Sequence, residues 1–197
     1  MHAHLIYGLG WLSFGLVHSL LATAAVKGRL QPVFGAASRL AYNMVAFLHI
    51  AAVWVFGLVM LDATPFAMEP GIGHALTAVR WLGVVVLLLA LSEYDLGRFS
   101  GLSQIRAQRL GQPDPGDEEL ITQGLHRFVR HPLYLGAHMI LWGGATDGFG
   151  LVTAAWGWLY LVIGARFEER TLSALYGEAY EDYRRRVPAL IPRPGRK

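Results

Sequence analysis

Long apolar stretches alternate with short polar connections along the chain. A helix needs about 20 apolar residues to cross the hydrocarbon core of a bilayer. Three stretches reach that length, and two shorter ones separated only by Thr-Asp-Gly predict a tight helical hairpin. The pattern predicts an all-α integral membrane protein with about five transmembrane helices. These helices are expected at roughly 4–25, 40–61, 75–97, 132–146 and 149–166.

Composition supports a single membrane domain. Of the 197 residues, 54% are hydrophobic and only 16% are charged, whereas about a quarter of residues are charged in soluble domains. The chain has no cysteine, which excludes disulfides, thiolate metal sites and a cysteine nucleophile. The N-terminal sequence MHAHL has no Lys or Arg, so we do not expect a cleaved signal peptide.

The distribution of basic residues predicts the orientation. Lys and Arg lie between the first two apolar stretches, after the third and at the C-terminus, whereas Asp62 and Glu69 lie between the second and third. The positive-inside rule then places the N-terminus outside and the C-terminus in the cytoplasm. We expect the bacterial inner membrane, with the active site on the cytoplasmic side. The basic residues concerned are Lys27, Arg29, Arg39, Arg98, Arg106, Arg109, Arg127, Arg130, Arg184, Arg185, Arg186, Arg193, Arg196 and Lys197.

Two long polar segments, 98–131 and 167–197, are expected on the cytoplasmic side. The second predicts an amphipathic helix that ends at Val187-Pro188 and lies on the membrane or on the first segment. Its apolar positions at helical spacing are Leu172, Leu175, Tyr176, Ala179, Tyr180 and Tyr183.

The sequence HRFVRHPLYLG (126–136) combines a basic cluster with a helix start. Proline suits the first helical position, and the free amides that follow it favour anions. Arg130 and His131 beside Pro132 could therefore bind a carboxylate or a ribose, with Tyr134 on the same face. The alternative is a basic membrane anchor at the beginning of a helix.

Adjacent acids follow the last apolar stretch, in RFEER (166–170). Acids at a membrane boundary are costly unless they are paired or hydrated. The hairpin would bring Glu168 and Glu169 close to His131, where they could bind ribose hydroxyls or a cationic ligand. The alternative is a salt bridge with Arg130 or Arg127.

Several polar side chains fall inside the apolar stretches, which suggests a functional cavity. His18, His49 and His138 are the ionisable ring groups, and two of them could ligate a haem iron. Hydrogen bonding between helices is the alternative for each histidine. Ser19, Asn43, Ser92 and Glu93 are further polar residues in or next to these stretches.

Two segments carry a family resemblance, LITQGLHRFVRHPLYLG (120–136) and EERTLSALYGEAYEDYRRRVPALIP (168–192). Together they resemble the isoprenylcysteine carboxyl methyltransferase and phospholipid methyltransferase superfamily of membrane enzymes. The N-terminal half, with HSLLA and RLAYN, resembles a related group. That group includes methanethiol S-methyltransferases, membrane proteins associated with nitric oxide metabolism, and haem-dependent ζ-carotene isomerases.

The resemblance implies that S-adenosylmethionine binds at the cytoplasmic end of the last two helices. It also implies a three-helix substrate-side half, 1–97, and a cofactor-binding half, 98–197. Gly164 stands where the prenylcysteine enzymes have an arginine that engages the substrate carboxylate, so a prenylcysteine substrate is not expected. The implied cofactor site comprises Glu118, Glu119, Leu120, Ile121, Gly124, His126, Arg130, His131, Pro132, Leu133, Tyr134, Glu168 and Glu169.

These features predict an S-adenosylmethionine-dependent methyltransferase whose small or lipophilic acceptor arrives from the bilayer. A thiol, a phospholipid amine or other lipid, a carboxylate and an isoprenoid remain open as acceptors, and the oligomeric state is open. We expect catalytic roles for His18, His138 and Arg166, and no metal site. The alternatives are a haem-binding isomerase or accessory protein of nitric oxide metabolism, using His18 and His49, and a non-enzymatic scaffold. No motif suggests nucleic-acid binding.

Overall fold

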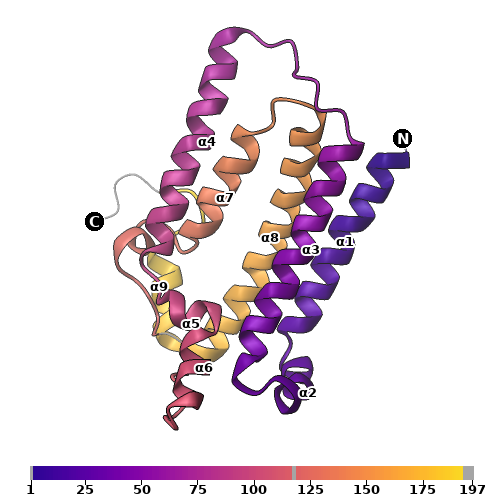
Figure 1. The fold of residues 1–197 in the computed structure, drawn as a ribbon. Coiled ribbons are helices and arrows are strands. Elements are labelled where there is room, and N and C mark those ends of the chain that lie inside the picture. Colours follow the sequence, from indigo (N-terminus) through magenta and orange to yellow (C-terminus); the bar gives the residue numbers. More distant parts are fainter. Residues whose placement is uncertain (1, 117–118, 193–197) are drawn as a thin grey trace. The chain divides into compact units, whose positions relative to one another are not determined.

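The computed structural model describes residues 2–116 and 119–192, and its elements in those ranges are helical (Figure 1). One isolated antiparallel bridge joins Pro65 and Asp147. The helices are α1 (His2–Ala22), α2 (Ala24–Phe34), η1 (Gly35–Ala37), α3 (Ser38–Met60), α4 (Pro70–Leu91), α5 (Leu96–Ser100), α6 (Leu102–Arg109), η2 (Gly124–Arg127), α7 (Pro132–Gly143), α8 (Gly148–Tyr176) and α9 (Glu178–Arg186).

Four stretches of helix are long and apolar enough to cross a membrane: α1, Ala25–Met60, α4 and α8. The prediction of an all-α integral membrane protein is therefore confirmed. Helix α7 has only 12 residues, or about 18 Å at 1.5 Å per residue, against a hydrocarbon core of about 30 Å. Five crossings and the orientation of the chain stay predictions.

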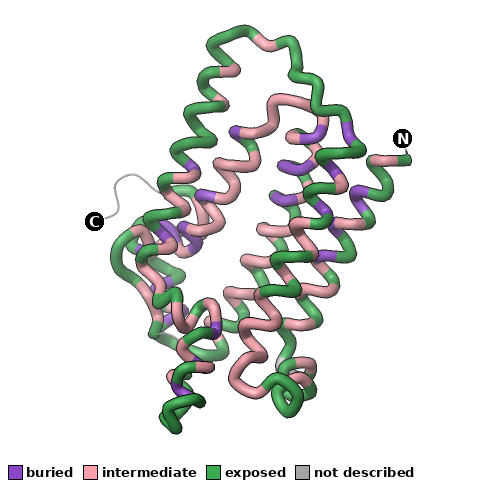
Figure 2. The backbone as a smooth tube through the Cα atoms, in the orientation of Figure 1, coloured by how far each residue is buried: buried purple, intermediate pink, exposed green. Residues whose placement is uncertain are grey.

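The outer faces of these helices are apolar. Leu5, Leu9, Leu12 and Leu16 of α1 are each more than half exposed, and the exposed positions continue along α3 and α4 (Figure 2). Exposed apolar surface of this extent is rare on soluble monomers. Contact with lipid accounts for these exposed apolar faces, because the hydrocarbon core of a bilayer holds no water that polar side chains would have to face.

The chain forms two compact units. Unit 1 comprises residues 1–61 and 95–118, and unit 2 comprises residues 62–94 and 119–197. Helix α4 therefore groups with α7, α8 and α9. The functional division into substrate and cofactor halves stays a prediction.

Unit 1 is a helix pair with a short helical insert. Helices α1 and α3 lie side by side (Figure 1), and a Cβ at Gly10 of α1 would lie 3.4 Å from the Val53 side chain. The segments that follow the first and third predicted membrane helices form the shorter helices α2, α5 and α6. Thr23 and Asp95 cap α2 and α5 through their side chains.

Unit 2 brings two backbones into direct contact. A Cβ at Gly83 of α4 would lie 2.8 Å from the carbonyl oxygen of Gly136, and one at Gly136 would lie 2.8 Å from the amide of Leu87. Glycines at such positions let membrane helices approach closely. The expected hairpin of α7 and α8 is present, and α7 in addition packs tightly along α4 (Figure 1).

The C-terminal amphipathic region is two helices rather than one. Helix α8 continues past the apolar stretch to Tyr176, and Gly177 then adopts φ +57°. That left-handed conformation suits glycine and ends the helix. Helix α9 follows and ends at Arg186, with Val187 as its C-cap, next to the end at Val187-Pro188 that the sequence predicted.

Candidate functional site

The basic cluster precedes α7 and is held by the C-terminal segment. The amide of Arg130 donates to the carbonyl of Pro188 at 2.9 Å, and that of His131 donates to Ala189 at 3.1 Å. Pro132 is the first helical residue, and no side chain among the described residues caps this helix. Leu135 donates to the His131 carbonyl, which leaves the amides of Leu133 and Tyr134 at the helix start.

The two acids of α8 meet this cluster in different ways. Glu169 forms an ion pair with Arg130 and accepts a hydrogen bond from Nε2 of His131 at 3.0 Å. Glu168 is twice as exposed, at 40% of its side chain, and its carboxylate is 3.9 Å from Nδ1 of His131. The charge of Glu169 is therefore neutralised within the protein. For this acid, the salt bridge with Arg130 that the sequence left open as an alternative is present. Glu168 accepts a hydrogen bond from the Tyr134 hydroxyl, and its half-exposed carboxylate can also face a ligand.

The remaining donors of Arg130 are also used by the protein. Its guanidinium donates to the carbonyls of Arg184 and Val187 at the end of α9. The His131 ring stacks on Tyr134, with ring centroids 5.3 Å apart and planes within 12°. Arg130 therefore fixes both Glu169 and the C-terminal segment, while His131 and Tyr134 form a flat surface at the start of α7.

A second polar cluster lies at the C-terminal end of α4. The Glu93 carboxylate accepts the amide of Leu125 at 2.6 Å and is 2.7 Å from Nδ1 of His126. Nε2 of that ring is 3.1 Å from the Tyr94 hydroxyl. The carboxylate requires a proton on Nδ1, so in the neutral ring Nε2 accepts a hydrogen bond that the Tyr94 hydroxyl donates. The buried His126 is thereby held on both sides.

Helix α9 fixes the same turn from its other side. The Tyr183 hydroxyl donates to the His126 carbonyl at 2.6 Å. Burial raises the pKa of Tyr180 to about 12 and raises the pKa of Tyr183 as well. Both phenols therefore keep their protons at neutral pH, and Tyr183 remains a donor.

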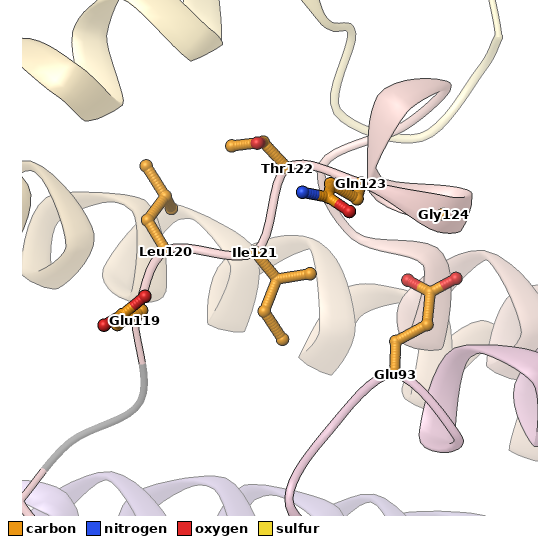
Figure 3. Close-up of a pocket in the computed structure, with 7 residues that line it drawn as sticks. All are labelled: Glu93, Glu119, Leu120, Ile121, Thr122, Gln123 and Gly124. Atoms are coloured by element: carbon orange, nitrogen blue, oxygen red, sulfur yellow. The ribbon is translucent and has the colours of Figure 1, made fainter.

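A cavity of about 440 Å³ adjoins this second cluster (Figure 3). That volume is within the range of small-molecule sites. Figure 3 shows the Glu93 carboxylate directed toward the turn at Gly124, where φ is +56° and a Cβ would collide with that carboxylate. The lining residues are Glu93, Glu119, Leu120, Ile121, Thr122, Gln123 and Gly124.

The sequence-predicted cofactor residues fall into two groups within unit 2. Four line the cavity, and the others lie at η2, at the start of α7 and on α8; Glu118 lies outside the described residues. Sequence reasoning missed the contacts of Glu93 with His126, and it missed Tyr94, Thr122, Gln123 and Tyr183. An acid directly after an apolar stretch was the available signal for Glu93, which was instead grouped with the polar residues of the membrane helices.

The three predicted catalytic residues lie on three different helices, and their catalytic roles stay predictions. In unit 1, His18 is 2.5 Å from the Tyr42 hydroxyl. In unit 2, His138 is on α7 and Arg166 is exposed on α8. His49 of the alternative haem pair lies 3.3 Å from the Ser13 hydroxyl. Hydrogen bonds between α1 and α3 thus explain how the polar residues His18 and His49 are accommodated in apolar helices.

Comparison with known proteins supports the resemblance seen in the sequence. A methanethiol S-methyltransferase of Pseudomonas deceptionensis is 30% identical over 185 residues, 91% of this chain and 69% of the relative. Methanethiol S-methyltransferase 2 of Bradyrhizobium diazoefficiens is 32% identical over 186 residues, 91% and 70% of the two chains. Protein-S-isoprenylcysteine O-methyltransferase of Schizosaccharomyces pombe is 33% identical over 86 residues, 39% and 34%.

No solved structure matches the chain significantly. The family described as "Protein of unknown function (DUF1295)" matches residues 29–187, and the names of the relatives indicate methyltransferase activity. The chain belongs to this family, and with it to the isoprenylcysteine carboxyl methyltransferase-like superfamily of membrane methyltransferases.

Proposed function

We propose that the protein transfers a methyl group from S-adenosylmethionine to a small or lipophilic acceptor that enters from the bilayer. The observation that carries the proposal is the unequal pairing of the two acids on α8. Glu169 is neutralised by Arg130 and His131, whereas Glu168 stands half-exposed beside the start of α7. A structural salt bridge needs the first acid and not the second.

The charges of the site suit this methyl donor. S-adenosylmethionine carries a sulfonium, an ammonium and a carboxylate next to an adenosine. Glu93, Glu119 and Glu168 supply negative charge for the two cationic groups, and the amides of Leu133 and Tyr134 suit the anionic group or a ribose hydroxyl. Residues 119–124 offer a cavity of the size that part of such a molecule requires. The donor, when bound, supplies an electrophilic methyl group.

Arg130 and Glu169 have a positioning role in this proposal. They hold His131 in its stack with Tyr134 and fix the segment after α9. Alignment of donor and acceptor supplies much of the rate in a displacement reaction, because the entropy of bringing them together is lost on binding. A rigid start of α7 therefore serves the chemistry without contacting the reacting atoms.

A small thiol is the first acceptor to test. The names of several relatives give methanethiol as their substrate. In this chain Gly164 leaves open space on α8, since a Cβ there would meet only the Tyr134 hydroxyl, at 3.9 Å. An isoprenoid alcohol and a phospholipid amine are the competing acceptors for the same assay.

Calorimetry of S-adenosylmethionine and its demethylated product on detergent-purified protein tests the proposal. Hydrogen bonds to charged groups contribute about 1.5–3 kcal/mol, so Glu168→Gln and His131→Ala should each weaken binding by roughly 10- to 100-fold. Glu178→Gln, an exposed acid on α9, is the matched control and should bind as the wild type. Wild-type protein that binds neither compound would refute the choice of methyl donor. Full binding by both site variants would refute the site.

A further inference from the structure

His138 has one ring nitrogen satisfied and one without a partner. Its Nδ1 is 2.6 Å from the carbonyl oxygen of Tyr134. A carbonyl can only accept, so Nδ1 carries the proton and Nε2 presents a lone pair. That Nε2 is buried and has no hydrogen-bond partner within the described part of the chain. A buried polar atom left without a partner destabilises the fold, and such an atom requires an explanation.

The place of His138 relates it to the proposed donor site. It lies one turn beyond Tyr134 on α7 and seven residues beyond His131, which is about 6 Å and about 10 Å along the axis at 1.5 Å per residue. Tyr134 is also the residue opposite Gly164, where α8 leaves space. By their spacing along the helix, His131, Tyr134 and His138 lie on the same side of α7.

We infer that Nε2 of His138 accepts the proton of the methyl acceptor, and that this acceptor is an uncharged thiol; the inference rests on the proposed function. A lone pair at Nε2 attracts a group that donates a hydrogen bond. It repels a carboxylate, which also presents lone pairs and has no proton to lose. An alkyl amine, like the lysine side chain, is a cation in water at neutral pH, whereas an alkyl thiol is a weak acid and enters an apolar interior uncharged.

The reaction balances with this single base. Nε2 takes the S–H proton while the acceptor sulfur forms a bond to the methyl carbon. The bond between that carbon and the donor sulfur breaks, and its electron pair stays on the donor sulfur. The products are a methyl thioether, the demethylated donor and a protonated His138, which returns its proton to water. A neutral imidazole with a free lone pair is a common general base in enzymes.

A binding experiment without the methyl donor tests the contact directly. Protein labelled with ¹⁵N-histidine is titrated with ethanethiol and, separately, with dimethyl sulfide, which is of similar size and has no S–H. In the NMR spectra, the chemical shift of Nε2 of His138, assigned by comparison with His138→Gln, should change when the thiol is added. It should not change when the thioether is added. No movement with the thiol, or equal movement with both compounds, would overturn the contact.

Turnover with thiols of different acidity tests the role as a base. Positioned bases contribute about 10²- to 10⁴-fold, so His138→Gln should slow ethanethiol methylation at least about 100-fold. With an aromatic thiol that is already a thiolate at the assay pH, the same variant should turn over only a few-fold more slowly than the wild type. Equal losses for both thiols would refute the base, and so would unchanged turnover.

Two controls separate this inference from the proposed function. His74→Gln, at an exposed position near the start of α4, should behave as the wild type. Binding of S-adenosylmethionine to His138→Gln should be unchanged by calorimetry. If wild-type protein binds no methyl donor and methylates nothing, the proposed function fails, and the donor-free titration still decides whether His138 contacts a thiol.

Discussion

The side-chain pairs that join the long helices differ in charge between the two units. In unit 1, α1 and α3 are joined by neutral pairs, His18 with Tyr42 and Ser13 with His49. In unit 2, the contacts at the ends of α4, α7 and α8 pair carboxylates with a guanidinium and imidazoles. Neutral pairs suffice to hold membrane helices together, whereas buried charges are costly and mark functional sites.

The energies behind this contrast differ several-fold. Hydrogen bonds between membrane helices contribute about 0.6 kcal/mol on average. Removing one partner of a buried ion pair costs about 3–5 kcal/mol, because the other charge is left uncompensated. If unit 2 holds its charges to bind a ligand, substitutions there should affect both folding and binding. Substitutions in unit 1 should affect folding slightly and binding not at all.

The largest effect is expected for Glu169→Ala. It leaves Arg130 and His131 without their shared carboxylate in a site where the Arg130 side chain is only 10% exposed. We expect the free energy of unfolding in detergent to fall by about 3 kcal/mol or more, together with loss of S-adenosylmethionine binding. Glu178→Ala, on an exposed face of α9, is the control and should change neither quantity. A stable Glu169→Ala protein would show that the pair is a surface contact.

Glu93→Gln should weaken binding more than it weakens folding. The amide can still accept from the Leu125 amide, but the charge beside Nδ1 of His126 is lost. We expect S-adenosylmethionine to bind roughly ten-fold more weakly, since a charged hydrogen bond contributes about 1.5–3 kcal/mol. Calorimetry measures the affinity, with Glu69→Gln in the α3–α4 connection as the control. Unchanged affinity would remove Glu93 and the adjoining cavity from the donor site.

Tyr183→Phe should lower stability by about 1–3 kcal/mol, because it leaves the buried His126 carbonyl without its donor. Chemical unfolding of the two proteins measures this difference. The same phenol also makes stability depend on alkaline pH. Burial raises the pKa of Tyr183 in the fold, whereas an unfolded tyrosine ionises near pH 10.

The sign of this dependence follows from linkage. Between about pH 10 and the folded pKa, the folded state binds more protons than the unfolded state, so stability falls as the pH rises. The stabilising contribution is complete below about pH 10 and is lost as the pH passes through the folded pKa. Wild-type stability should therefore decline more steeply than that of Tyr183→Phe in this range. Parallel curves would contradict the raised pKa.

Much of the fold could be predicted from the sequence because apolar length and helix starts are local signals. The predicted stretch at 132–146 begins at Pro132, as helix α7 does in the structure. The hairpin was also predicted, and so was the end of the last helix next to Val187. The contact between the acids of α8 and His131 could be expected, because in a helical hairpin the chain returns to the end at which the first helix starts.

The contacts of α4 could not be predicted in the same way. The close approach at Gly83 and Gly136 depends on two glycines 53 residues apart facing each other, which no local pattern reveals. The role of Glu93 depends on the turn at Gly124, more than 30 residues away. Helix α2 was missed because its 11 residues contain Pro32, Lys27 and Arg29, which favour a connection.

The smallest effect is expected for Tyr42→Phe in unit 1. The variant removes the hydroxyl that lies 2.5 Å from Nε2 of His18 and keeps the ring contact between the two residues. Stability should fall by only about 0.6 kcal/mol, the average for such bonds between membrane helices, and S-adenosylmethionine affinity should not change. Denaturant titration and calorimetry on one preparation measure both quantities. A loss of binding as large as that of Glu93→Gln would show that the neutral pairs of unit 1 also serve the donor site, and the contrast between the units would then lie in their chemistry and not in their function.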